Sequence, residues 1–427
     1  MGVQRNVFLD SANPGTSDRV AWLLIGVLLL VGPIANAPAL RHALLVIALF
    51  YCINELVRGR IGNHWLRIFL PWIIVVLASA TWSLRPKTTL IDAIWEVLGP
   101  ISAGILAMSL SSRAAPRWVV LPFAALAIGC LASVMGGLQV HLGVDPGLPG
   151  WLLKTYPGRG VASTIGVLVV LIGIWMMIGD PGDGDDARNH RWRAGGWLMV
   201  LLGLLLGILG HNRMFWFAVL LGLLPWLVRL KAYSMRVRLL LPVLLLITGL
   251  TGVIYSSVVM KVQHEVGVED AVTVLQDKYA SDPRWIIWSG WGKVILDQPV
   301  AGYGYGTRIL PRIGEKKIPA DIEDAVHAQH HAHNVFLNVL VQTGALGLIA
   351  FLWMIGGLFQ ETLARVRESA GATRERWASV GAASLLLGAL AKALTDDFYW
   401  GPANIVMWVF VGIFLGMAMH QAGREPN

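Results

Sequence analysis

Residues 327–347, HAQHHAHNVFLNVLVQTGALG, join a long polar stretch directly to an apolar segment. Four histidines lie in the first seven residues of this stretch, where a membrane helix would meet water. The pair His333-Asn334 is followed, after nine residues, by the run Gly344–Gly347. We expect this junction to be the active centre, with the rest of the chain anchoring it or bringing a lipid-linked substrate to it.

The composition is that of a membrane protein. Hydrophobic residues make up 56% and charged residues 14% of the 427 residues, whereas soluble domains carry about 25% charged residues. The formal net charge of +8 comes from basic residues clustered between apolar segments, so nucleic acid is excluded as a partner. Cys52 and Cys130 lie within apolar segments, so neither a disulfide nor a zinc site is expected.

Apolar segments recur along the chain at the length of about 20 residues that a spanning helix needs. They predict an all-α polytopic membrane protein with about 12 transmembrane helices. We expect spans one to nine in residues 1–258, a periplasmic helical segment in 259–332 and the last spans in 333–427. The predicted spans are 20–36, 38–56, 68–83, 90–110, 118–138, 160–179, 195–210, 214–229, 239–258, 333–358, 377–395 and 403–420.

Basic residues cluster in the loops that follow every even-numbered span. Such loops remain on the cytoplasmic side, so both termini are expected there. The turn Gly210–Arg213, the segment 259–332 and Asp396-Asp397 then face the non-cytoplasmic side. The basic residues are Arg58, Arg60, Arg67, Arg113, Arg117, Arg188, Arg191, Arg193, Arg229, Lys231, Arg236, Arg238, Arg365, Arg367, Arg374 and Arg376.

The segment 259–332 is expected to contain two helices. Residues 261–279 have the spacing of an amphipathic surface helix. A second helix is predicted to begin at Asp282-Pro283 and to end at Asp297–Pro299, and its tryptophans favour the membrane interface. The alternating glycines of Gly302–Gly306 predict a tight loop after it.

Two arginines are candidates for binding an anion. Arg213 closes the turn that also holds His211, at the membrane edge, and Arg284 lies in the first turn of the tryptophan-bearing helix. A guanidinium fork grips phosphate oxygens, so two of them on one side of the membrane suit a pyrophosphate. The alternatives are a snorkelling Arg213 and a surface Arg284 paired with Asp282 or with a lipid phosphate.

His333 is the candidate general base, because imidazole titrates near neutral pH. Asn334, Asn338 and Gln342 are expected to form a polar stripe beside it on one continuous helix. A metal site of histidines at i and i+4, or a merely interfacial histidine, is the alternative. Asp396-Asp397 are expected to orient a histidine, neutralise an arginine or lie solvated in a loop. Lys392 is a candidate for a charge buried in the membrane, and because it lies near a span end the alternative is that it snorkels.

These residues resemble the O-antigen ligase family, within the O-antigen ligase/polymerase superfamily. The resemblance rests on Arg213, on Arg284-Trp285 with Trp288, on the Gly302-x-Gly304-x-Gly306 loop and on His333-Asn334-x9-Gly344-x2-Gly347, and it covers roughly residues 210–350. It implies a GT-C-like helical membrane fold with a cavity open sideways to lipid.

The resemblance also implies the activity, an inverting and metal-independent glycosyl transfer without a cofactor. The donor would be O-antigen on undecaprenyl pyrophosphate and the acceptor lipid A–core oligosaccharide, at the periplasmic face of the bacterial inner membrane. His333 would act as base and Arg213 and Arg284 would hold the pyrophosphate, with His211, Asn334, Asp396 and Asp397 supporting them.

Three other functions remain open at this point. An O-antigen polymerase and a protein O-oligosaccharyltransferase would share the motif. A polysaccharide transporter would be expected to bury charges at mid-membrane in broken helices, and the sequence has little sign of them.

Overall fold

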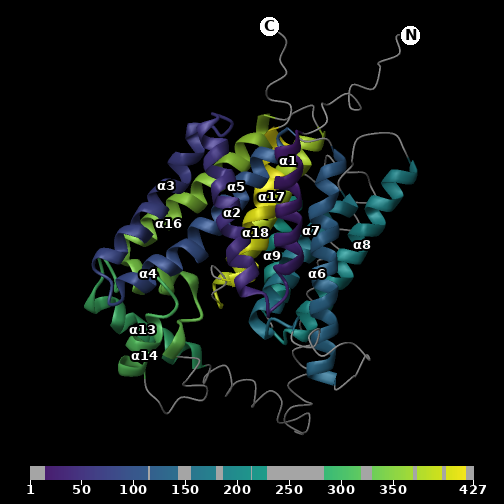
Figure 1. The fold of residues 1–427 in the computed structure, drawn as a ribbon. Coiled ribbons are helices and arrows are strands. Elements are labelled where there is room, and N and C mark those ends of the chain that lie inside the picture. The colour runs from purple at the N-terminus through teal and green to yellow at the C-terminus, as the bar shows by residue number, and fades with distance from the viewer. Residues whose placement is uncertain are drawn as a thin grey trace.

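The protein, in a computed structural model, is described over residues 15–113, 116–142, 155–178, 186–212, 214–227, 283–318, 329–368, 373–396 and 401–419 (Figure 1). Within these residues every regular element is a helix, and eight helical segments are long and apolar enough to cross a membrane. The predicted all-α polytopic class is therefore confirmed. The predicted helices at 239–258 and 261–279 lie outside the described residues, so the total of about 12 spans stays a prediction.

Most described helices begin and end within about five residues of the predicted limits, but α8 begins nine residues before 195 and α16 ends ten residues after 358. Proline is the first residue of several of them, where its missing N–H costs nothing. The elements are α1 (Thr16–Val31), α2 (Pro38–Val57), α3 (Asn63–Ala78) with η1 (Ser79–Thr81), α4 (Pro86–Asp92), η2 (Ala93–Leu98), α5 (Gly99–Ser111), α6 (Pro116–Leu142), α7 (Arg159–Ile178), α8 (Asp186–Leu209), α9 (Met214–Gly222), α10 (Leu224–Leu227), α13 (Pro283–Asp297), α14 (Leu310–Lys317), α16 (Val335–Glu368), α17 (Thr373–Ala393) and α18 (Gly401–Met419).

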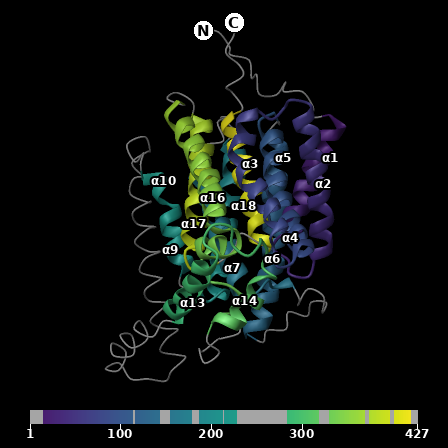
Figure 2. The same ribbon diagram turned by 90° about the vertical axis from the view of Figure 1, so that its left-hand side faces the viewer.

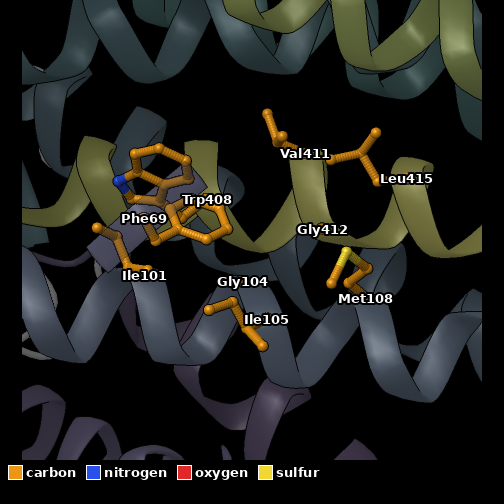
Figure 3. Close-up of a pocket in the computed structure, with 9 residues that line it drawn as sticks. All are labelled: Phe69, Ile101, Gly104, Ile105, Met108, Trp408, Val411, Gly412 and Leu415. Atoms are coloured by element: carbon orange, nitrogen blue, oxygen red, sulfur yellow. The ribbon is translucent and has the colours of Figure 1, made fainter. Parts of the chain in front are cut away.

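Small residues let α18 pass through the centre of the bundle against α5. A Cβ atom added at Gly104 would lie 2.6 Å from the carbonyl oxygen of Trp408, and one added at Gly412 would meet the Gly104 backbone. Such contacts stabilise membrane helices by close packing. Figure 3 shows the small gap beside this contact, which Phe69, Met108 and other apolar side chains line. The contact therefore serves packing and offers no polar site.

The two ends of the bundle differ in chemistry. At one end Arg60 and Arg113 both bind Glu55, with Nη1–Oε1 and Nη2–Oε2 distances of 3.0 and 2.5 Å. We call this the basic end. At the other end lie α13 and α14 together with the connection between α3 and α4 and the connection after α17 (Figures 1 and 2). We call it the α13 end, and it carries the predicted site residues that the structure describes.

The short helices α13 and α14 form a second hydrophobic core against the start of α16. Ile287, Trp291 and Val294 of α13 pack there with Ile313 of α14 and Val341 of α16. Trp291 is fully buried. The prediction that this tryptophan faces the membrane interface is therefore wrong, because its indole fills the space between two protein segments.

The helix that follows His333 is broken at Gly344, contrary to the continuous helix that the sequence predicts. Gly344 has φ 63°, a left-handed conformation that glycine adopts without strain. The amides of Ala345 and Leu346 donate to the carbonyls of Pro299 and Val300, at 2.8 and 3.2 Å. A loop backbone thus packs against Gly344 and satisfies groups freed by the break.

Replacing Gly344 by alanine is expected to lower both thermal stability and activity. The new Cβ would meet the backbone of Val300, and the left-handed conformation itself costs an alanine about 1–2 kcal/mol. Gly356→Ala in the same helix is the matched control, because nothing lies within 4 Å of a Cβ at that position. Thermal unfolding in detergent measures the effect, and equal melting temperatures for the two variants would contradict the prediction.

Candidate functional site

His333 lies just before α16 and outside its helical turns. Its φ of 49° is left-handed, which is uncommon for a residue other than glycine. The preceding residue, Ala332, is held on both sides: its carbonyl accepts from Trp288 Nε1 at 2.9 Å, and its amide donates to Asn338 Oδ1 at 2.8 Å. The tertiary contacts of Ala332, and not the helical register, therefore set the position of His333.

Asn334 begins α16 as its N-cap. The side-chain Oδ1 accepts from the amides of Phe336 and Leu337, at 2.9 and 3.2 Å. The other side-chain atom, Nδ2, donates to the carbonyl of Leu394 at 3.0 Å, just past the end of α17. Asn334 thus both starts the helix and ties His333 to the connection that carries Asp396.

The other polar residues of the predicted stripe bind backbone. Asn338 is buried against Ala332, and Gln342 Oε1 accepts from the amide of Gly306 at 2.9 Å. Tyr303 and Gly304 donate to the carbonyls of Val341 and Gln342, at 3.0 and 2.8 Å. Gln342 therefore holds the glycine loop in place, and Asn338 holds Ala332. The two side chains do not line a surface beside His333.

His331 accompanies His333. The two ring centroids are 3.8 Å apart, and the amide of His333 donates to His331 Nδ1 at 3.2 Å. His330 is exposed, and His327 lies outside the described residues. Among the residues described, no group of three or more His, Cys, Asp or Glu side chains could hold a metal ion.

Lys392 and Asp396 form a buried ion pair next to these histidines. Lys392 Nζ lies 2.7 Å from Asp396 Oδ2, and the lysine side chain is 0% exposed. The alternative that Lys392 snorkels is therefore wrong, because its ammonium turns inward to a carboxylate. Burial raises the pKa of Asp396, but Lys392 and then His331 and His333 lower that pKa by more, so it lies below its ordinary value. Asp397 lies outside the described residues.

The first turn of α7 joins this group to the turn that holds His211. A Cβ atom added at Gly160 would lie 3.2 Å from Asp396 Oδ2. Burial lowers the pKa of His211, and the neighbouring Arg159 lowers it further. The His211 ring packs edge-on against His141 at 5.2 Å, and His211 also has a left-handed φ of 45°. The sequence analysis did not single out Arg159 as a neighbour of His211. A cation at the first residue of a span on this side is the signal that could have indicated it.

The structure describes the backbone of one of the two predicted phosphate-binding arginines, Arg284, and the turn around the other, Arg213. The backbone of Arg284 lies in the first turn of α13, one turn before Trp288. Arg213 lies outside the described residues, but the turn around it is defined. The amide of Met214 donates to Asn212 Oδ1 at 3.0 Å, so α8 and α9 are joined by the predicted four-residue break.

Fold and site together define a multi-pass, all-helical membrane protein with ionisable groups gathered at one end. Residues 198–352 match the model of a family described as O-antigen ligase. The match spans α9, α13, α14 and the segment with His333, so this part of the chain is similar to that family. A comparison with curated proteins finds no match.

Proposed function

We propose that the protein transfers O-antigen glycan from undecaprenyl pyrophosphate to a sugar of the lipid A–core oligosaccharide. One observation carries the proposal: Asn334, the residue after His333, donates to the Leu394 carbonyl beside the Lys392–Asp396 ion pair, at the membrane end to which α13 is also docked. Ionisable groups at a span end, supported by a buried counter-charge, are costly to maintain and mark functional sites in membrane proteins.

In the proposed reaction His333 is the general base. It removes the proton of the acceptor hydroxyl while that oxygen attacks the anomeric carbon from the side opposite the pyrophosphate, so the configuration inverts. The Asp396 carboxylate is negative at neutral pH, since its pKa is lowered, and it stabilises the imidazolium that forms. His331 and Asn334 position the base, and Asp397 adjoins the group in sequence.

The leaving pyrophosphate is proposed to be held by arginines. Arg213 lies two residues after His211 in the α8–α9 turn, and Arg159 lies beside that same turn. Arg284 stands one turn before Trp288, whose indole binds the residue preceding His333. Charge matching by guanidinium groups stabilises a pyrophosphate that departs, so we propose that the transfer is independent of metal ions.

The α13 end is proposed to face the periplasm and the basic end the cytoplasm. The basic residues of the loops after α2 and α5 support this, because such loops stay on the cytoplasmic side of the inner membrane. Both termini would then be cytoplasmic. Residues 259–332 would form a periplasmic segment between two membrane parts, 1–258 and 333–427.

Reconstitution in vesicles tests the proposal and separates its rivals. The purified protein is given polyprenyl-pyrophosphate glycan and lipid A–core, with and without a chelator. A new glycolipid on lipid A–core is expected in both conditions. Elongated polyprenyl-linked chains would instead indicate a polymerase, the second function that the family match supports. Glycan on a protein acceptor, movement of donor across the bilayer without transfer, or loss of activity in chelator would each overturn the proposal.

Arg284→Lys is expected to lower kcat/KM for the donor about 10- to 100-fold, even though the charge is kept. Lysine cannot form the planar fork that binds two phosphate oxygens at once. Arg312→Lys on α14 is the matched control, because Arg312 is exposed at the same end of the bundle. Initial rates at varied donor concentration measure the effect, and wild-type kinetics for Arg284→Lys would show that a simple positive charge suffices.

A further inference from the structure

A second group of charged residues lies within the membrane-spanning segment Pro86–Ser111. Asp92 is 3% exposed and accepts from Nε of Arg308 at 3.1 Å, and Nη2 of Arg308 contacts the same carboxylate oxygen. Thr307 Oγ1 donates to Glu96 Oε1 at 3.3 Å. The glycine loop therefore places Arg308 and Thr307 against two carboxylates that belong to a transmembrane helix.

The helix is widened where these carboxylates lie. Residues 93–98 form a π-helical turn, η2, which interrupts the regular hydrogen bonding of the span. Asn404 Nδ2 of α18 donates to the carbonyl of Glu96 at 2.6 Å, so a side chain from another helix compensates the irregular backbone. Turns of this kind are rare and occur frequently at functional sites.

An aromatic surface adjoins the charges. His42 of α2 stacks on Trp95 with ring centroids 4.4 Å apart and an angle of 20° between the planes. Both side chains are half-buried, as is Glu96, so part of each remains accessible. Trp95 follows Asp92 by three residues and precedes Glu96 directly, so the stack adjoins the segment that carries both carboxylates.

Ion pairing alone does not account for this arrangement. The Arg308 side chain is 55% exposed, so its guanidinium stays accessible although it binds Asp92. Asp92 Oδ2 is buried and has no hydrogen-bond partner among the described residues. Two carboxylates around one guanidinium disfavour a phosphate, and Arg41, which adjoins His42, is turned to the carbonyls of Ile34 and Ala35.

We propose that Glu96 and Arg308, the latter held in place by the buried Asp92, bind a hydroxyl-rich sugar ring of one of the two glycan substrates beside the His42–Trp95 stack. Carboxylates accept hydrogen bonds from sugar hydroxyls, the guanidinium donates to ring and hydroxyl oxygens, and the aromatic surface covers the apolar side of the ring. The subsite rests on the proposed function, and it is connected to the reaction centre through the bond from Gly306 to Gln342 of α16.

Glu96→Gln and Arg308→Lys test the subsite in the reconstituted transfer assay. KM is measured separately for polyprenyl-pyrophosphate glycan and for lipid A–core. At least a tenfold rise in KM for one substrate is expected, with kcat changed less than twofold and the melting temperature unchanged for Glu96→Gln. The substrate whose KM rises identifies the source of the ring. Glu315→Gln and Arg312→Lys, both exposed on α14, are the matched controls.

A purely structural role for the Asp92–Arg308 pair makes a different prediction. The double variant Asp92→Leu/Arg308→Met removes both charges, so it is expected to regain stability lost in either single variant. Under the proposal its KM remains raised, whereas under a structural role its KM returns to the wild-type value. Wild-type KM values for both substrates in folded Glu96→Gln and Arg308→Lys would also overturn the subsite.

Direct binding separates failure of the subsite from failure of the proposed function. Calorimetric titration with the delipidated core oligosaccharide and with released O-antigen glycan needs no turnover. Binding of one of them that is weakened tenfold by Glu96→Gln supports the subsite even if no transfer occurs. Equal binding of both to wild-type protein and variant, or binding of neither to the wild type, would overturn it.

Discussion

Replacement of His333 is expected to abolish glycan transfer while the protein still folds and inserts. Loss of a general base lowers turnover by about 10²- to 10⁴-fold. Two variants, His333→Ala and His333→Asn, are needed, because His333 has φ 49° and alanine adopts this conformation only with strain. His333→Asn removes the base but keeps a residue that tolerates the left-handed conformation, so it isolates the chemical effect from the backbone effect.

His330→Ala is the matched control for the His333 variants. It lies on the same connection before α16 but is exposed, and its removal is expected to change the rate less than twofold. The rate of transfer to lipid A–core and the melting temperature are measured for all three variants. Substantial transfer by folded His333→Asn would show that His333 is not the base. His331, its ring neighbour, would then be the candidate.

Lys392→Met is expected to destabilise the protein by about 3–5 kcal/mol, because it leaves the Asp396 carboxylate buried without its partner. Unfolding in detergent measures the loss. The double variant Lys392→Met/Asp396→Leu is expected to recover most of the stability, since well-packed apolar side chains replace buried ion pairs at little cost. It is not expected to recover transfer, because the charge that stabilises the imidazolium is gone.

The pH dependence of this stability has a definite sign. The pKa of Asp396 is lowered in the folded protein, so the pair contributes fully above the ordinary pKa of about 4 and its contribution declines as the pH falls through the lower folded value. Unchanged stability in Lys392→Met, or wild-type transfer by the double variant, would show that the pair is dispensable.

Several structural features could be predicted from local sequence alone. A run of apolar residues as long as a bilayer is thick has to form a helix there, because no water satisfies its backbone. The break between α8 and α9 therefore falls at the predicted residues 210–213, and α13 begins at Pro283 and ends at Asp297 as predicted. The left-handed φ of Gly302, Gly304 and Gly306 likewise confirms the predicted glycine loop.

The positions of the site residues depended on contacts between distant segments. Nothing in the apolar run after His333 indicates that Pro299 and Val300 bind its backbone at Gly344, because loop and helix meet only after the chain has folded. Lys392 is near a span end in sequence. Its buried ammonium is stable only because Asp396 lies beside it. The partnership of Asp92 with Arg308 joins residues 216 positions apart.

The sequence by itself therefore determined the helical membrane class of the protein and the limits of helices such as α13, since these follow from hydropathy, proline and glycine acting locally. Tertiary structure alone decided that Asn334 binds the end of α17, that Asp396 lies beside His331 and His333, and that the α7 start meets the turn of His211. These are pairings of buried polar groups, and such groups are stable only where a partner from elsewhere in the chain meets them.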